Sequence, residues 1–150
     1  MFNFFKKKCD VIIKLVSDKY VPIYAKNGDA GADIKSVEHV SIKPRETVVV
    51  KTGLRVEIPE GYEIQIRPRS GLAAKYGITV LNSPGTIDSG YRGEIGVILH
   101  NTSKKEFKIL KGDRIAQMVV NKVYRGKFRL VTKLSSSDRE EGGFGSTGKE

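Results

Sequence analysis

The sequence predicts an all-β fold, because apolar residues recur with a period of two and turn-forming residues interrupt them at short intervals. The alternation is clearest at 54–58 and 63–67, where apolar side chains alternate with charged or amide ones. Further apolar or β-branched runs predict strands at 11–16, 47–50, 95–99, 115–120 and 128–134. Many short strands at close spacing are typical of a sandwich, a barrel or a jelly roll.

Turn signals separate the predicted strands, at 27–29, 43–44, 59–61, 83–85 and 111–113. The run at 95–99 is almost continuously apolar, which predicts a strand covered on both faces. Only the segment 70–76 is expected to form a helix, of about two turns, with Ala73 and Ala74 at its centre. Ser70 is expected to cap the N-terminus of this helix, which favours anions.

The composition fits one folded domain. The chain has 150 residues, of which 39% are hydrophobic and 29% charged, so extensive disorder is not expected. It contains no run of 18 apolar residues, and no transmembrane helix is expected. A single cysteine, Cys9, excludes an internal disulfide framework, and His39 and His100 are too far apart in sequence to favour a tetrahedral metal site. With no targeting segment at 1–8, we expect a cytoplasmic protein.

The chain is expected to divide into a flexible N-terminal extension at 1–10, a β domain at 11–134 and a mobile C-terminal lid at 135–150. The lid is rich in glycine and serine, and its one large apolar residue, Phe144, cannot form a core. Residues 143–148 match G-x-G-x-x-G, but that phosphate-binding motif needs a preceding strand and a following helix. We expect instead a segment whose backbone N–H groups wrap an anion and which its ligand orders.

Basic residues outnumber acidic ones by 27 to 17, which gives a net charge of +10. The excess is concentrated at 104–129, where nine basic and two acidic residues give a local charge of +7. Such a field attracts polyanions, which include nucleic acids and nucleotides with several phosphates. The aromatic residues of this stretch, Phe107, Tyr124 and Phe128, form no recognisable nucleic-acid motif. A nucleic-acid-binding β-barrel stays an alternative, but we expect no stable nucleic-acid binding.

Two aspartates are candidates for chemistry. Asp33 and Asp88 each follow small or apolar residues, which favours partial desolvation of their carboxylates. An aspartate beside glycine also commonly satisfies its own backbone in a turn, so the alternative for either residue is a structural role. The sequence has no G-x-S-x-G elbow, and local spacing suggests no Ser, His and Asp set.

Five segments, in this order, resemble the motifs of the homotrimeric deoxyuridine triphosphatase (dUTPase) family. They are AGADIKS at 30–36, RPRSGLAAKYGI at 67–78, NSPGTIDSGYRGEIGV at 82–97, KGDRIAQ at 111–117 and REEGGFGSTG at 139–148. The resemblance covers residues 11–148. It departs from the family pattern at Glu140, where the fifth motif usually has glycine, and at Gly90, where an acid often precedes the tyrosine.

The resemblance implies a distorted β-barrel of jelly-roll type with one short helix, which assembles as a homotrimer with shared active sites and a glycine-rich lid. It implies hydrolysis of dUTP to dUMP and pyrophosphate, which keeps uracil out of DNA and supplies dUMP for thymidylate synthesis. Asp88 is then expected to be the general base for a water that attacks the α-phosphorus. Mg²⁺ is expected to be held by phosphates and water, with Asp33 contacting it through water.

The resemblance also assigns the substrate contacts. Uracil is expected to meet a β-hairpin that supplies Asn82, Gly85, Thr86, Ile87 and Gly96. Tyr91 is expected to pack on the deoxyribose, and Phe144 is expected to stack over the uracil. The phosphates are expected to contact Arg69, Ser70, Gly71, Gln117, Arg139, Gly145, Ser146 and Thr147.

Two further alternatives stay open. A deoxycytidine triphosphate deaminase has a similar fold, but it lacks the hairpin signature GTIDSGYRG at 85–93 and needs a glutamate that acts on the base. A binding or regulatory protein descended from such an enzyme is expected to lack Asp88 or the tail motif, and this chain has both.

Overall fold

The largest sheet has four antiparallel strands in the order β2-β11-β6-β8. The computed structural model describes residues 10–145 and 148. The strands of this sheet are β2 (Ala32–Lys35), β11 (Arg114–Lys122), β6 (Tyr62–Arg67) and β8 (Gly85–Ile87). Because β8 lies at the edge of this sheet, part of its backbone N–H and C=O groups face away from β6.

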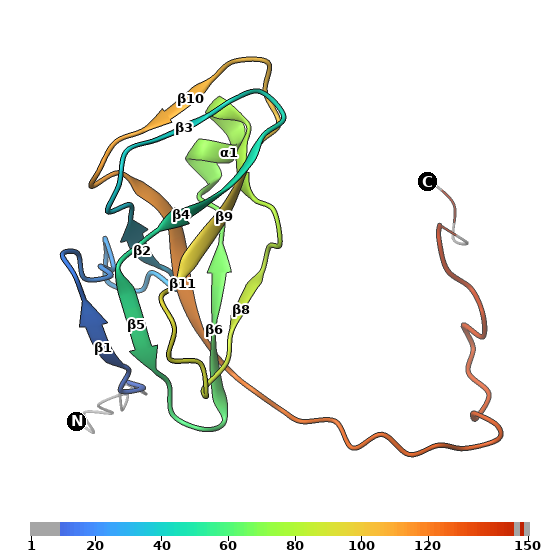
Figure 1. Cartoon of the computed structure of the whole chain (residues 1–150). Helices are drawn as coiled ribbons and strands as arrows, with labels where there is room; N and C mark the ends of the chain where they lie inside the picture. The colour runs from blue at the N-terminus through green and yellow to red at the C-terminus, as the bar shows by residue number, and fades with distance from the viewer. Residues whose placement is uncertain (1–9, 146–147, 149–150) are drawn as a thin grey trace, which may run out of the picture.

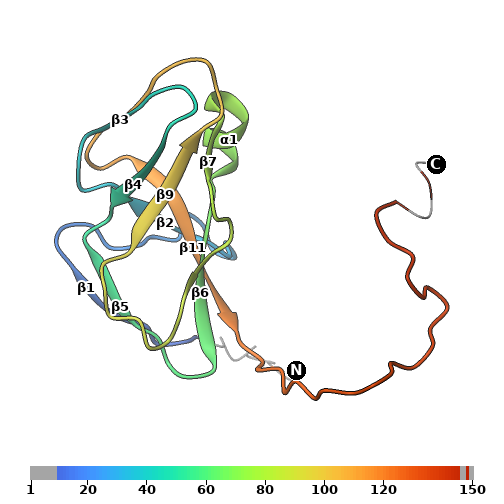
Figure 2. The ribbon, with the colours of Figure 1, turned by 45° about the vertical axis from the view of Figure 1, so that its right-hand side comes forward.

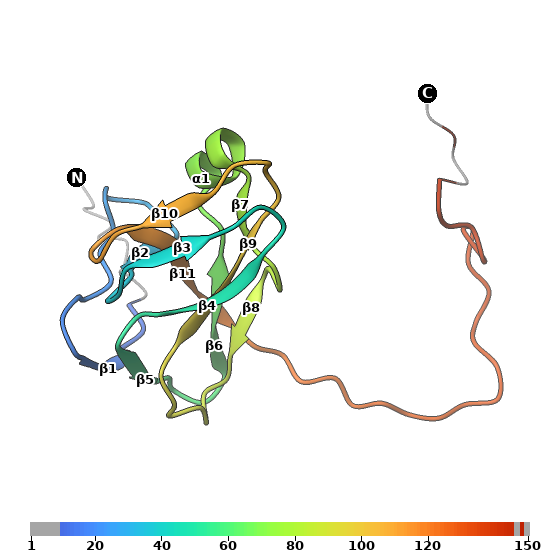
Figure 3. The same cartoon turned by 45° about the horizontal axis from the view of Figure 1, so that its top comes forward.

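Three smaller sheets complete the barrel. One has the order β4-β9-β7, and its strands are β4 (Thr47–Lys51), β9 (Gly96–Asn101) and β7 (Ile78–Val80). The other two each contain two strands, β1 (Lys14–Ser17) with β5 (Leu54–Glu57) and β3 (Val40–Ile42) with β10 (Phe107–Ile109). Figures 1, 2 and 3 show the strands around a common interior, with α1 (Ser70–Tyr76) at one end. The predicted all-β, distorted jelly-roll-like barrel with one short helix is thereby confirmed.

The core between the strands is aliphatic. Ile34, Ile64, Ile78, Val97 and Leu99, from four different strands, are each at most 1% exposed. Burial of one such side chain stabilises a fold by about 1.5–3 kcal/mol. These contacts give the loops around α1, β8 and β9 a rigid frame.

Four of the predicted strands form where the alternation placed them. The runs at 47–50, 54–58, 63–67 and 115–120 are confirmed as β4, β5, β6 and β11. The run at 11–16 is only partly a strand, because β1 begins at Lys14, where its pairing with β5 starts.

The prediction that residues 95–99 are covered on both faces is wrong. In β9, Val97 and Leu99 are buried, whereas Gly96 is exposed and Ile98 is half-buried. The strand lies in the middle of β4-β9-β7, whose second face turns outward, so that alternate residues enter the core. Ile98 pairs on that outer face with Val49, which is 63% exposed.

The predicted helix is confirmed as α1, but the prediction that Ser70 caps it is wrong. Ser70 is the first helical residue, and Arg69 occupies the N-cap with φ −88° and ψ 125°. No side-chain hydrogen bond caps this end within the described part of the chain. The Arg69 side chain is instead drawn away from the helix into an ion pair with Asp33. Gly77 ends the helix at φ 67°, a left-handed conformation that glycine adopts without strain.

The strand predicted at 128–134 is not formed. Phe128, Leu130 and Leu134 are 101%, 100% and 81% exposed. Figures 1 and 3 show the chain leaving the barrel after β11 and running away from it. Alternation forms a strand only where an edge pairs with it and a surface covers its apolar face. The described residues of this one chain supply neither to the segment.

The surface of the β1–β5 pair carries one ion pair. Lys14 Nζ donates to Glu57 Oε1 at 3.0 Å, and this hydrogen bond lowers the pKa of the Glu57 carboxyl below its ordinary value. The two side chains are 73% and 48% exposed, so their contact contributes little to stability. No helix among residues 10–145 is long and apolar enough to cross a membrane.

Candidate functional site

A hollow of about 210 Å³ lies beside β8 and β9. The uracil and deoxyribose contacts expected from the hairpin line it, together with Asp88: Asn82, Gly85, Thr86, Ile87, Tyr91 and Gly96. Its apolar floor consists of Ile66, Val80, Ile95 and Ile98. The volume is below that of a pocket for a drug-sized ligand, so the hollow suits one planar group and its immediate substituent.

All three residues of β8 line the hollow. Its register with β6 is fixed by the pairs Ile87↔Ile64, Thr86↔Gln65 and Gly85↔Ile66. The free edge of β8 therefore offers backbone donors and acceptors in a fixed alternating order. Such an edge can form hydrogen bonds with a planar ring whose own donors and acceptors match that order.

Asp88 follows the last residue of β8, begins the next turn and lines the hollow. Its carbonyl accepts a hydrogen bond from the Tyr91 N–H at 3.1 Å, and both residues are exposed. The carboxylate takes part in none of the hydrogen bonds or ion pairs found among residues 10–145. The partial desolvation expected for Asp88 is absent in this single chain, and its carboxylate is accessible to water.

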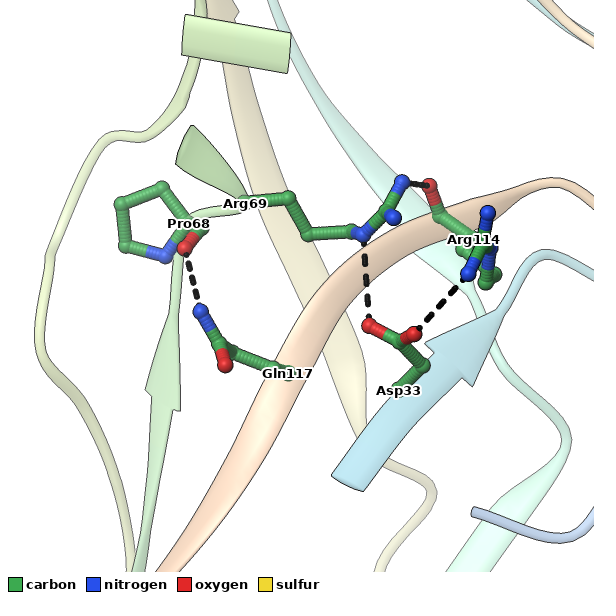
Figure 4. Close-up of polar contacts among 5 residues, drawn as sticks. All are labelled: Asp33, Pro68, Arg69, Arg114 and Gln117. Atoms are coloured by element: carbon green, nitrogen blue, oxygen red, sulfur yellow. Dashed lines mark hydrogen bonds and ion pairs between the residues drawn. The ribbon is translucent and has the colours of Figure 1, made fainter. Parts of the chain in front are cut away.

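Apart from the hollow, a cluster of charged side chains lies around Asp33 on β2. It consists of Asp33, Arg69 and Arg114, and we call it the arginine cluster. Asp33 Oδ1 is 3.2 Å from Arg69 Nε, and Asp33 Oδ2 is 3.3 Å from Arg114 Nη1 (Figure 4). Arg69 Nη1 also donates to the backbone carbonyl of Arg114 at 3.3 Å. The Asp33 side chain is 19% exposed, so its expected partial burial is confirmed. One carboxylate thus holds two arginines, and the cluster keeps an excess positive charge that suits phosphate.

Gln117 belongs to the same cluster by register. It pairs with Asp33 on one side and with Arg67 on the other, so the three residues form a row across β2, β11 and β6. Its Nε2 donates to the Pro68 carbonyl at 2.9 Å (Figure 4). The pairing of β11 with β2 shifts register between Arg114 and Ala116, which is a bulge. Bulges re-aim side chains, and this one lies where Arg114 reaches Asp33.

Sequence reasoning overlooked Arg114 as a member of this cluster. It lies within the fourth motif, directly after the Gly-Asp turn at 112–113, but no spacing rule locates a bulge. Ser70 and Gly71 form the exposed first turn of α1, beside Arg69. The first N–H groups of a helix have no partner within the helix, so they are available to an anion.

Asp88 at the hollow and Arg69 in the arginine cluster lie toward opposite ends of β6. Asp88 follows Ile87, which pairs with Ile64 near the start of the strand, and Arg69 comes after its end. At about 3.3 Å per residue, the chain from residue 64 to residue 69 spans roughly 16 Å. Asp88 and Arg69 of one copy therefore start from backbone positions at the two ends of this span.

The described C-terminal residues that were expected at the site, Arg139, Phe144 and Gly145, lie away from both the hollow and the Asp33 cluster. Arg139 Nε donates to the Gly142 carbonyl at 2.7 Å, and Phe144 is 114% exposed. Figure 2 shows this part of the chain far from the barrel, as do Figures 1 and 3. Gly145 has φ 84°, a backbone conformation that lets consecutive N–H groups converge. Ser146 and Thr147 lie outside the described residues.

The described residues contain no group of three or more His, Cys, Asp or Glu side chains that could hold a metal ion. In the arginine cluster, both carboxylate oxygens of Asp33 lie against arginines. A protein cage for Mg²⁺ is thus absent from the described part of the chain. The residues fit an ion that arrives with its phosphates and keeps several waters, which is how Mg²⁺ is commonly bound.

Comparison with known proteins gives one family. A sequence model of the dUTPase family matches residues 18–148. The deoxyuridine 5'-triphosphate nucleotidohydrolase of Crocosphaera subtropica is 56% identical over 137 residues, which cover 91% of this chain and 96% of that protein.

Solved structures agree with this result. The Staphylococcus bacteriophage 80alpha dUTPase with dUPNHPP superposes with a TM-score of 0.84 at 30% identity, over 91% of this chain and 98% of that one. A mutant dUTPase from phage phi11 of S. aureus, described with a structural Mg(II) ion, superposes with a TM-score of 0.75 at 28% identity. That match covers 85% of this chain and 99% of the phage chain.

Proposed function

This chain belongs to the dUTPase family of dUTP-hydrolysing enzymes, and we propose that it converts dUTP to dUMP and pyrophosphate with Asp88 as general base. One arrangement supports the proposal above all. Asp88 is exposed to water and lines a hollow that the edge strand β8 also lines. A nucleoside held in that hollow would have its 5′ phosphates near the carboxylate.

Asp88 acts on the attacking water. Its carboxylate orients a water about 3 Å away and accepts its proton. The water oxygen bonds to the α-phosphorus as the bond from that phosphorus to the α,β-bridging oxygen breaks. Pyrophosphate leaves with the electron pair of that bond, and the proton on Asp88 returns to solvent.

The hollow recognises the uracil base. We assign uracil to Asn82 and to the backbone of Gly85, Thr86, Ile87 and Gly96. Cytosine has an acceptor at N3 and a donor at C4, where uracil has a donor and an acceptor, so it leaves backbone groups unpaired. A site of this kind discriminates by about 10⁴. A 5-methyl group meets the tight hairpin and excludes thymine. Tyr91 packs on the deoxyribose and leaves no room for a 2′-hydroxyl.

The arginine cluster binds the triphosphate. Arg69, Ser70, Gly71 and Gln117 supply charge and donors, while Asp33 keeps Arg69 in place and contacts Mg²⁺ through water. Mg²⁺, when bound, would neutralise phosphate charge that otherwise opposes nucleophilic attack on the α-phosphorus. The net charge of +10 raises the rate at which this multiply charged anion is captured.

We propose that the active sites are shared in a homotrimer. The span of roughly 16 Å between Asp88 and Arg69 within one chain supports a site built from two copies, one supplying the hollow and the other the arginine cluster. The uncovered apolar side chains of 124–134 support contact with another copy, since such a row is otherwise exposed to water.

The C-terminal segment closes the site in this proposal. The chain divides into an extension at 1–10, a β domain at 11–134 and a lid at 135–150. Arg139, Gly145, Ser146 and Thr147 wrap the phosphates, and Phe144 stacks on the uracil. Closure excludes water and strengthens each charge contact. The reaction belongs in the cytoplasm, where it removes dUTP before DNA synthesis and supplies dUMP.

A pyrophosphate-release assay with Mg²⁺ and each of dUTP, dCTP, dTTP and UTP tests the proposal. Pyrophosphate release from dUTP alone is expected. Ammonia release from dCTP would instead identify a deaminase. Tight, salt-sensitive binding of oligonucleotides without turnover of dUTP would favour a nucleic-acid-binding protein.

A further inference from the structure

We propose that Gly93 determines the sugar specificity of this enzyme, because its missing side chain is the space in which Tyr91 folds back across the hairpin. The proposal rests on the proposed function, in which Tyr91 excludes the 2′-hydroxyl of ribonucleotides. It goes beyond that function by naming the residue that sets the position of the ring.

The Tyr91 ring is anchored at its far end. Its hydroxyl donates to the Glu94 carbonyl at 2.9 Å, and its backbone N–H donates to the Asp88 carbonyl at 3.1 Å. The side chain therefore turns back over the residues that follow it, and its hydroxyl crosses Gly93 to reach Glu94. This conformation keeps the ring on the hollow that Asp88 also lines.

The ring occupies the place of a Gly93 side chain. A Cβ at this position would lie 2.6 Å from Tyr91 Cζ and 3.0 Å from Tyr91 Cε2, and its three nearest atoms would all belong to Tyr91. Carbon atoms in contact are normally about 3.5–4.0 Å apart. Gly93 has no positive φ, so its backbone does not itself require glycine. The requirement comes from the ring alone.

The ring yields more easily than the backbone beneath it. Tyr91 is 43% exposed and its hydroxyl makes one hydrogen bond, to Glu94. The hairpin behind it is tied to the barrel, because Glu94 Oε1 accepts from the Gly53 N–H at 2.9 Å and the Ile95 N–H donates to the Leu54 carbonyl at 2.8 Å. A methyl group at residue 93 therefore pushes the ring outward and leaves the hairpin in place.

Outward movement of the ring widens the sugar end of the hollow. A ribonucleotide then gains access that the native ring denies, while uracil still meets β8. Gly93→Ala is expected to raise the ratio of kcat/KM for UTP to kcat/KM for dUTP by about tenfold or more, since it removes a steric exclusion and no uracil contact.

Gly90 provides a matched control in the same turn. A Cβ at Gly90 meets nothing within 4 Å, and Gly90 also has no positive φ. Gly90→Ala therefore adds the same methyl group to the hairpin without touching Tyr91, and the UTP to dUTP ratio should stay within about twofold of the wild type.

The experiment measures pyrophosphate release from dUTP and UTP for the wild type, Gly90→Ala, Gly93→Ala, Tyr91→Ala and the double variant Tyr91→Ala with Gly93→Ala. Thermal unfolding of each is recorded. The expected result is a raised ratio in Gly93→Ala and in Tyr91→Ala, with no further rise in the double variant, because the ring that Gly93 positions is then gone.

Three outcomes overturn the inference. They are an unchanged ratio in Gly93→Ala beside a raised one in Tyr91→Ala, a ratio that rises equally in Gly90→Ala, and loss of the folded protein in Gly93→Ala, which would mean that the backbone yields before the ring. A wild type that releases no pyrophosphate from dUTP counts against the proposed function instead, so the two failures are distinguishable.

Discussion

Asp33 Oδ1 lies 3.2 Å from Arg69 Nε, so a carboxylate on β2 fixes the arginine that immediately precedes α1. The same carboxylate reaches Arg114 through Oδ2 at 3.3 Å. Asp33 thus joins the first, second and fourth motifs, which are far apart in sequence, at one point of the surface.

The variant Asp33→Asn tests whether the Asp33 carboxylate supports Mg²⁺-dependent activity. The amide keeps the shape of the side chain but loses the charge that lies against both arginines and that, in the proposed function, contacts the hydrated Mg²⁺. The Mg²⁺ concentration for half-maximal pyrophosphate release should rise about tenfold, as for a lost outer contact to a metal. Glu60→Gln, at an exposed turn between β5 and β6, is the control. An unaltered Mg²⁺ titration in Asp33→Asn would count against this role.

Asp88→Asn separates catalysis from binding. The amide cannot accept the proton of the water, and loss of a general base lowers kcat by about 10²–10⁴. Affinity for dUpNHpp, the ligand named with the phage enzyme, should change little, because the walls of the hollow are untouched. Calorimetry measures that affinity. Loss of binding together with turnover would indicate that Asp88 is structural.

Two truncations separate the lid from the assembly. Removal of 139–150 should leave a folded trimer with little activity, since it takes away only the glycine-rich end. Removal of 124–150 should also dissociate the trimer, because it takes away Phe128 and Leu130, which are fully exposed in one chain. Light scattering and pyrophosphate release check both. A fully active 1–138 chain, or a trimeric 1–123 chain, would contradict the assignment.

Phe144→Trp reports on closure of the lid. The chain contains no tryptophan, so the emission comes from this position alone. Phe144 is 114% exposed in the single chain, and stacking on uracil should shift the emission of the tryptophan when dUpNHpp and Mg²⁺ are added. dTTP provides the control, because we expect its methyl group to keep it out of the hollow. Emission that dUpNHpp leaves unchanged would rule out stacking at this residue.

Most of the barrel was predictable because apolar and polar residues alternate in a strand that buries only one face. Ile64 and Ile66 alternate with polar neighbours in β6, and both are buried. The same signal misled at 128–134, because alternation records an apolar face and not the chain that covers it. For β9, the near-continuous apolar run gave no sign that one face of the strand turns outward, where Ile98 is half-buried.

The site was predictable where it follows a motif and unpredictable where it depends on register. Asp88, Tyr91 and Asn82 come from one hairpin segment, and they line one hollow. Arg114 reaches Asp33 beside a bulge in the β11–β2 pairing, which no sequence period reveals. The prediction that Ser70 caps α1 was wrong for a related reason, since a long-range ion pair with Asp33 determines where Arg69 lies.

The central claim is that Asp88 of one copy works on a phosphate held by Arg69 of another. Co-expression of Asp88→Asn and Arg69→Ala chains, carrying different tags, tests it through pyrophosphate release from dUTP by the purified mixed trimers. Each variant alone should be almost inactive. The purified mixed trimers should recover about a third of the wild-type rate, because each of them regains one of its three sites with both native residues. Mixed trimers no more active than either parent would contradict the shared site.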